Sequence, residues 1–258
     1  MSRGIRTWLE DRLYRLRFPD VAVLHLRPRT RATEPGADGY SQEGQDRYVL
    51  AAFFRDDKAQ PGFFLDVGSN DPVLFNNTYL FEQLGWKGLA IEPMATLAQR
   101  WKLKRSAPLL NVAAGAAEGE VEFEQVEDAG IRDMFSAVVG ASTKNSKFSK
   151  RRIKVPVRPL SAILAEAGVT RVNFMSLDVE GFELEVLRGM DFSRCRFDVV
   201  LIENNAPKKW FGDARIRRVM QDHGFVHYAR FWKADDLFVS PQFLAEKGLR
   251  SGGVKKVE

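Results

Sequence analysis

The sequence predicts an α/β protein with a mostly parallel sheet and helices on both faces. Short apolar runs bounded by Gly, Pro, Asn or Asp recur along the chain, and they alternate with segments in which apolar residues have helical spacing. Strands that alternate with helices form βαβ units, which build a parallel sheet. The chain has 258 residues, 45% of them hydrophobic, and this length suits one large domain with a sizeable core.

The first strand of this sheet is expected over residues 63–67, and it runs into the small polar turn Gly68-Ser69-Asn70. Capping signals place the following helix between Asn76 and Gly85. An earlier helix is expected to begin at Ser41. The remaining strands are expected over 89–91, 109–113, 121–123, 153–157, 172–177 and 197–202, with a hairpin over 225–230 and 237–239, and the remaining helices over 95–103, 161–167, 183–187 and 215–222.

Three regions are expected along the chain. Residues 1–39 form a basic N-terminal extension and linker, residues 40–240 form the main domain, and residues 241–258 form a C-terminal tail. Within the main domain, residues 128–152 are polar and basic with little periodicity, which predicts a long loop. Residues 5–18 carry apolar side chains at helical spacing among arginines. This segment is expected either to pack on the domain as a helix or to lie on a membrane or a partner as an amphipathic helix.

Composition and charge narrow the classes of partner and compartment. The net charge is +5 and the sequence pI is about 9.3, and basic residues gather in the first segment and over residues 144–158. Such density favours a phosphate, an acidic sugar, a membrane surface or nucleic acid, although a solvated face is the simpler explanation. The single cysteine, Cys195, excludes an intrachain disulfide. The chain start lacks the apolar core of a signal peptide and no apolar run could span a bilayer, so the cytoplasm is the expected location.

Four of the apolar strands end at acidic residues, namely Asp66, Glu92, Asp178 and Glu203. If the sheet is parallel, these ends face one crevice, where α/β proteins bind their ligands. A carboxylate after the second strand suits a ribose diol, and Glu92 holds that place. The first loop lacks the G-x-G-x-x-G pattern of a dinucleotide site, and its acids would repel a pyrophosphate. They would tolerate a cationic, phosphate-free cofactor, which favours S-adenosylmethionine over a nicotinamide dinucleotide.

Several motifs stand in order along the chain, namely Ser41-Gln42-x-Gly44-Gln45-Asp46, Gly62-Phe63-Phe64-Leu65-Asp66-Val67-Gly68, Asn77-Thr78, Gly85-Trp86-Lys87-Gly88 with Ile91-Glu92-Pro93, and Leu177-Asp178-Val179-Glu180-Gly181-x-Glu183. The chain resembles the FkbM family of S-adenosylmethionine-dependent methyltransferases from about Tyr40 to Val239. The resemblance implies a Rossmann-like class I methyltransferase fold, with a mostly parallel seven-stranded sheet and a C-terminal antiparallel hairpin. It also implies methyl transfer to an oxygen of a sugar, glycan or secondary metabolite.

Cofactor-binding residues follow from the resemblance position by position. The turn at Asp66 to Asn70 would hold the methionine part of the cofactor, and Glu92 would hold the ribose. The segment from Asn111 to Ala114 would flank the adenine, although it lacks the acid expected there. Ser41 and Gln45 would close over the cofactor, unless they serve as helix caps. The full expected set is Ser41, Gln45, Asp66, Gly68, Ser69, Asn70, Thr78, Glu92, Pro93, Asn111, Ala113 and Asp178.

Catalysis at a hydroxyl needs a proton acceptor, because a sugar hydroxyl is a very weak acid. Asp178, Glu180 and Glu203 are the expected bases. Carboxylates also suit Mg²⁺, but acids alone do not specify a metal, so no metal ligand is assigned. The basic loop over residues 144–154 is expected to close over an anionic acceptor, such as a phosphosugar, a nucleotide sugar or a lipid-linked glycan. An RNA-binding or RNA-modifying protein and a non-catalytic scaffold remain alternatives, whereas DNA is not an expected partner.

Overall fold

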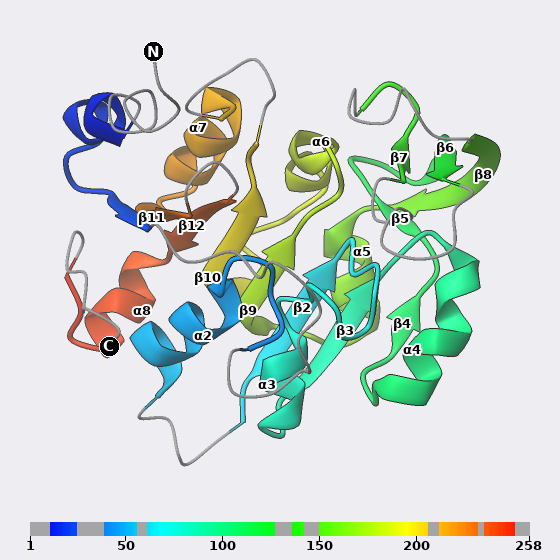
Figure 1. Ribbon diagram of the computed structural model, residues 1–258, viewed down its shortest axis with the longest axis horizontal. Coiled ribbons are helices and arrows are strands. Elements are labelled where there is room, and N and C mark those ends of the chain that lie inside the picture. Colours follow the sequence, from blue (N-terminus) through cyan, green and yellow to red (C-terminus); the bar gives the residue numbers. More distant parts are fainter. Residues whose placement is uncertain are drawn as a thin grey trace, which may run out of the picture.

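The protein is a two-sheet α/β structure in the computed structural model (Figure 1). The structure describes residues 11–24, 39–55, 61–126, 136–141, 150–205, 212–231 and 235–250. The larger sheet has eight strands in the order β1-β11-β12-β10-β9-β2-β3-β4. Its strands are β1 (Ala22–Leu24), β2 (Phe63–Val67), β3 (Lys87–Ile91), β4 (Leu109–Leu110), β9 (Arg171–Leu177), β10 (Arg196–Glu203), β11 (Val226–Phe231) and β12 (Asp235–Val239).

Strand directions show that the large sheet is mixed and that it contains the expected antiparallel hairpin. β12 pairs antiparallel with both β10 and β11, and every other pairing in the large sheet is parallel. The expected number of seven strands is wrong, because the sheet has eight. The additional strand, β1, comes from the region expected as an N-terminal extension, and it pairs with β11. β1 therefore covers an edge that would otherwise present unpaired backbone groups.

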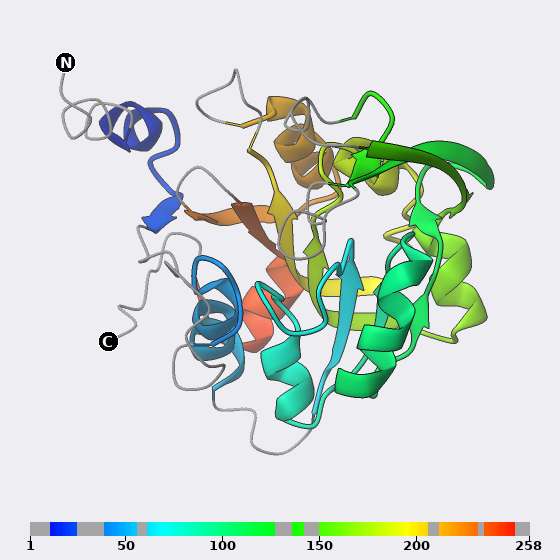
Figure 2. The same cartoon turned by 45° about the vertical axis from the view of Figure 1, so that its right-hand side comes forward.

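A smaller sheet lies beside the first (Figures 1 and 2). Its strands are β5 (Ala113–Ala114), β6 (Gly119–Val126), β7 (Ala137–Val138) and β8 (Lys150–Arg158), in the order β5-β8-β6-β7. The single strand expected over residues 109–113 is therefore wrong: the chain leaves the large sheet after β4 and joins the small one at β5. Between them, the side chain of Asn111 donates a hydrogen bond to the carbonyl of Glu92 at 3.1 Å. β7 and the start of β8 fall within the expected loop over residues 128–152, most of which lies outside the described residues.

Helices cover both faces of the large sheet, as expected. One face packs α5 (Leu160–Glu166), α6 (Glu183–Arg188) and α7 (Ala214–Asp222) through a cluster that includes Leu160, Val186 and Ile216. The other face packs α2 (Gln45–Val49), α3 (Tyr79–Gln83) and α8 (Pro241–Glu246) through a cluster of aromatic side chains. A π-helical turn (Leu50–Phe54) extends α2, and a 3-10 turn (Ala95–Leu97) leads into α4 (Ala98–Lys104).

α8 lies in the region expected as a C-terminal tail. Its start carries ordinary helix signals, because Ser240 accepts a hydrogen bond from the backbone N–H of Phe243 and Pro241 occupies the first turn. Phe243 is buried in the aromatic cluster, 5.5 Å from the ring centre of Phe54. Among the described residues, none of the helices is long and apolar enough to span a membrane.

Candidate active site

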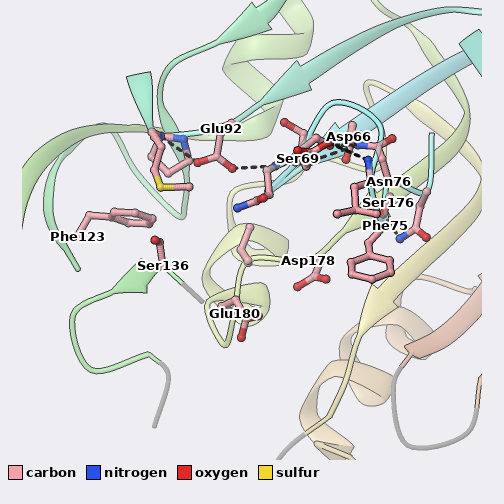
Figure 3. A pocket seen from close by; sticks show the side chains of 18 residues that line it. Asp66, Ser69, Phe75, Asn76, Glu92, Phe123, Ser136, Ser176, Asp178 and Glu180 are labelled. Atoms are coloured by element: carbon pink, nitrogen blue, oxygen red, sulfur yellow. Dashed lines mark hydrogen bonds between the residues drawn. The ribbon is translucent and has the colours of Figure 1, made fainter. Parts of the chain in front are cut away.

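An open pocket lies at the carboxyl ends of β2, β3 and β9 (Figure 3). It holds about 650 Å³ of empty space, part of which is continuous with solvent. Glu92, Phe123 and Ser136 lie at one end of the pocket in Figure 3, and Phe75 and Asp178 lie at the other. The lining residues are Asp66, Gly68, Ser69, Asn70, Asp71, Leu74, Phe75, Asn76, Asn77, Glu92, Pro93, Met94, Phe123, Ser136, Ser176, Asp178, Val179 and Glu180.

Gly68 allows β2 and β9 to approach each other at the floor of the pocket. Its φ is +79°, and a Cβ atom there would lie 1.8 Å from the backbone oxygen of Asp178. The backbone N–H of Gly68 donates to the carbonyl of Ile91, the last residue of β3, at 2.9 Å. Both the positive φ and the close approach exclude a side chain here. A glycine at this position therefore allows the ends of β2, β3 and β9 to lie close together.

Asp66 anchors the loop that follows β2. It is buried, and its Oδ2 accepts hydrogen bonds from Asn76 Nδ2 at 2.9 Å and from Thr78 Oγ1 at 2.7 Å. Burial raises the pKa of the Asp66 carboxyl, while Arg105 and the two hydrogen bonds oppose the rise. Asn76 Oδ1 in turn accepts from the backbone N–H groups of Thr78 and Tyr79, and so caps the start of α3. The carboxylate thus fixes the first loop against the next helix.

A buried arginine, Arg105, donates hydrogen bonds to the loop between β2 and α3. Its side chain is fully buried, and it pairs with Glu82 through Nε. Its two Nη atoms donate to the carbonyl of Pro72 at 3.0 Å, to Asn76 Oδ1 at 3.2 Å and to Thr78 Oγ1 at 3.0 Å. The guanidinium also lies 4.3 Å from the ring centre of Trp101. Sequence reasoning missed this residue, since an arginine after a helix usually reads as a surface charge.

Glu92 is oriented by two backbone donors. Its Oε2 accepts from the N–H of Asn70 at 3.1 Å, and its Oε1 accepts from the N–H of Met94 at 2.9 Å. The side chain is buried and lines the pocket. A carboxylate oxygen has more than one acceptor position. Glu92 can therefore accept further hydrogen bonds from a ligand in the pocket without releasing the loop.

Three buried polar atoms around the pocket lack hydrogen-bond partners among the described residues. They are Ser69 Oγ, Asn70 Oδ1 and Asn77 Oδ1. A buried polar atom without a partner is costly, so a cluster of them in one pocket indicates a polar ligand. Backbone strain gathers in the same place. In the part of the chain that the structure describes, the non-glycine residues with positive φ are Asn70, Phe75 and Glu180, and all three line the pocket.

Carboxyl groups crowd the other end of the pocket. Oxygen atoms of Asp178, Glu183 and Glu203 lie within 4.8 Å of one another. Asp178 is exposed to the open pocket but lies below the surrounding surface, and desolvation together with the nearby carboxylates raises its pKa well above the ordinary value. Desolvation and Glu203 raise the pKa of Glu183 to about 7, although its oxygen accepts from the N–H groups of Val179 and Gly181. The Glu183 carboxyl therefore has its pKa near neutral pH.

A fourth carboxyl joins this cluster from the hairpin. Asp235 is the first residue of β12 and pairs with Glu203 of β10. Burial is the main reason why the pKa of the Asp235 carboxyl is raised to about 7. Gln45 Nε2 donates to Asp235 Oδ2 at 2.6 Å, so α2 holds this carboxyl in place. Sequence reasoning missed Asp235, because it begins an antiparallel strand and lies far along the chain from the other acids. Only the sheet order brings its carboxyl to Glu203.

Two of the expected cofactor residues, Ser41 and Ala113, do not line the pocket. Ser41 Oγ donates to Asp46 Oδ1 at 2.6 Å and accepts from the backbone N–H of Asp46 at 3.3 Å, so it contacts the start of α2. Ala113 packs with Met94 and Phe123 in the core of the small sheet. The other expected residues that do not line the pocket support the site through the contacts described above. They are Gln45, Thr78, Asn111 and Glu203.

The remaining expected residues line the pocket together. They are Asp66, Gly68, Ser69, Asn70, Glu92, Pro93, Asp178 and Glu180. Met94, Phe123 and Ser136 line the end near Glu92, where the sequence led us to expect Asn111 and Ala113. No local sequence pattern marks Phe123 or Ser136 as pocket residues, because the position of the small sheet places them there.

The basic segment after the small sheet is partly neutralised where the structure describes it. Lys150 and Arg152 of β8 pair with Glu124 of β6, at 2.5 Å and 3.4 Å. Lys154 lies 4.0 Å from Glu120 on the same strand. The basic residues at 144 and 147 lie outside the described residues. The charge of β8 is therefore shared with β6 rather than concentrated on the pocket.

Comparison with known protein families agrees with this architecture. The family model described as the methyltransferase FkbM domain matches residues 66–226, which is more than half of the chain. A search among curated proteins finds no match. The matched range begins at Asp66 and includes the pocket residues from β2, β3 and β9 as well as Glu203 of β10. The chain therefore belongs to the FkbM methyltransferase domain family, and it is a methyltransferase.

Proposed function

We propose that the chain transfers a methyl group from S-adenosylmethionine to a hydroxyl of a sugar, glycan or secondary metabolite. The observation that carries this proposal is the position of Glu92. Two backbone donors hold its carboxylate at the end of β3, facing the same pocket as the Gly68 turn. In a sheet of this order, that place suits a carboxylate that accepts from both hydroxyls of a ribose.

The pocket residues fit this cofactor from end to end. Met94 and Phe123 give apolar walls beside Glu92, which suits an adenine ring. Ser69 Oγ and Asn70 Oδ1 are buried acceptors that suit the ammonium group of the methionine part. The acids of the site favour a positively charged ligand over a phosphate. When bound, the cofactor supplies an electrophilic methyl group on a sulfonium sulfur.

Asp178 is the proposed proton acceptor. It lines the pocket at the end away from Glu92 (Figure 3), whereas Glu203 stands behind it. Asp178 would accept the hydroxyl proton as the acceptor oxygen takes the methyl group from the sulfur. A raised pKa makes this carboxyl a stronger base than an ordinary aspartate. Glu180 also lines the pocket and is the second candidate.

The charge around Asp178 also constrains the acceptor. Carboxyl groups of Glu183, Glu203 and Asp235 stand close behind it, so an anionic group next to the reacting hydroxyl would be repelled. A phosphate or acidic group on the acceptor would have to lie away from these carboxyl groups. A neutral polyol at the reacting position avoids this repulsion, and its other hydroxyls can donate hydrogen bonds to these carboxylates.

A labelled methyl donor tests the proposal. The chain is incubated with S-adenosylmethionine carrying a carbon-13 methyl group and with a panel of glycosides, nucleotide sugars and polyhydroxylated metabolites. The methyl chemical shift in the product identifies the atom that accepts the group, and we expect an O-methyl signal. An N-methyl or C-methyl product would contradict a hydroxyl acceptor. Labelling of RNA in preference to these compounds would favour the RNA-modifying alternative.

The matched variants separate chemistry from binding. Asp178→Asn should lower turnover by about 10²-fold or more, as expected for loss of a general base, and should leave the affinity for S-adenosylhomocysteine within a few fold. Glu122→Gln, on the exposed side of β6, should leave both unchanged. Full turnover by Asp178→Asn would refute its role as the proton acceptor. A parent chain that binds no S-adenosylhomocysteine would support the non-catalytic scaffold.

A further inference from the structure

The helix over residues 11–17 presents an apolar face that is exposed in the part of the chain that the structure describes. Residues 11–17 are helical, and within them Tyr14 is fully buried. Leu16 and Leu13 are instead 72% and 46% exposed. With 3.6 residues per turn, Leu13 and Leu16 share a face that lies nearly opposite Tyr14 and Phe18. The helix therefore has two apolar faces, one buried and one open.

The buried face is fixed firmly to the domain. The ring of Tyr14 lies 4.7 Å from that of Phe18, and Phe18 lies 6.0 Å from the ring of His227 on β11. The guanidinium of Arg217, on α7, lies 5.1 Å from the ring centre of Phe18. The helix sits at the outer edge of the molecule, on the side away from the small sheet (Figures 1 and 2). Its second apolar face thus has a fixed direction relative to the domain.

Arginines flank the open face. Arg12, Arg15 and Arg17 are all exposed, and Asp11 is the only acid within the helical residues 11–17. The sequence places Ile5 and Leu9 at four-residue intervals before Leu13. Residues 1–31 contain eight arginines and three acids, while the remaining residues contain 31 basic and 31 acidic side chains. The entire net charge of +5 therefore resides in this N-terminal stretch.

We propose that this helix docks the protein on an anionic lipid surface through Leu13 and Leu16, with the arginines meeting lipid headgroups. An apolar stripe bordered by arginines is the pattern of helices that lie in the membrane interface. Anionic lipids attract nearby Arg side chains, and the attraction adds to the burial of the leucines. A protein partner would need a complementary acidic groove, whereas a lipid surface needs only negative charge. The proposal does not depend on the proposed function.

Vesicle sedimentation of the full chain provides the test. The probes are phosphatidylcholine vesicles, with and without phosphatidylserine. We expect the parent chain to sediment with the phosphatidylserine vesicles and to be released by salt, because salt screens surface charge. Leu13→Ser combined with Leu16→Ser should raise the lipid concentration for half-sedimentation by about tenfold or more. Arg12→Gln combined with Arg17→Gln should raise it by about tenfold as well.

The chain offers a matched control elsewhere on its surface. Leu84 and Leu103 are 50% and 81% exposed, so Leu84→Ser combined with Leu103→Ser removes the same chemistry from another place. This control should sediment as the parent does, and all variants should keep the parent's thermal midpoint. Failure of the parent to bind phosphatidylserine vesicles would overturn the proposal, as would equal losses in the two leucine pairs. A parent dimer that dissociates in the Leu13 and Leu16 variant, without vesicle binding, would assign the face to a second copy.

Discussion

Replacing Arg105 by methionine tests whether buried charge pairing holds the first loop of the site. Methionine keeps much of the side-chain volume but removes the guanidinium. Glu82, whose side chain is 7% exposed, would then lose its charged partner. The carbonyl of Pro72 and the side chains of Asn76 and Thr78 would each lose a donor. Removing one partner of a buried ion pair typically costs about 3–5 kcal/mol, because the other charge stays buried.

The expected result is a fall of about 3–5 kcal/mol in the free energy of unfolding, measured by urea denaturation. At roughly 2 °C per kcal/mol for a chain of this size, the thermal midpoint should fall by about 6–10 °C. Arg100→Met is the matched control, because Arg100 is 51% exposed in its pair with Asp71 and should cost about 0–1 kcal/mol. The double variant Arg105→Met/Glu82→Met should recover part of the loss, since no unpaired charge remains. Equal losses for Arg105→Met and Arg100→Met would refute the reasoning.

Two further predictions concern the backbone and the protons of the site. Gly68→Ala should lower the free energy of unfolding by more than about 3 kcal/mol, through its positive φ and its contact with the Asp178 carbonyl. Gly140→Ala has a similar φ of +83° with no atom within 4 Å, so it should cost only about 1–2 kcal/mol; similar losses would contradict the close approach. Glu183, with its pKa raised to about 7, stabilises the fold when protonated, so this contribution is lost as pH rises toward and through 7. The free energy of unfolding of the parent should therefore fall by up to about 3 kcal/mol from about pH 5 to pH 8. Glu183→Gln should make the free energy of unfolding less dependent on pH. An unchanged pH dependence, measured by urea titrations, would count against the assignment.

The strand-end acids show how far sequence reasoning reaches into the site. Glu92 and Asp178 were predictable, because each directly follows an apolar run and parallel strands end at one edge of a sheet. Gly68 was predicted to lie in the turn after the first strand, and the structure places the carbonyl of Asp178 against it. These features depend only on local pattern and on the sheet being parallel.

Other features depend on contacts that no local pattern encodes. Arg105 reaches the loop after β2 from the far end of α4, and Asp235 meets Glu203 only because β12 lies between β10 and β11. The break between β4 and β5 was hidden in one short, mostly apolar segment, which the chain divides between two sheets. Phe123 enters the pocket because β6 belongs to the small sheet, which the sequence indicated only as separate strands. Predicting them requires the order of the strands rather than their positions.

Calorimetric titration with S-adenosylhomocysteine tests the central claim most directly. The parent chain should bind one equivalent. Glu92→Gln should bind about 10- to 100-fold more weakly, since hydrogen bonds to a charged group are worth about 1.5–3 kcal/mol. Glu122→Gln, exposed on β6, should bind as the parent does. Unchanged affinity in Glu92→Gln would contradict the assignment of the β3 end to the ribose, and the absence of binding by the parent would contradict the cofactor itself.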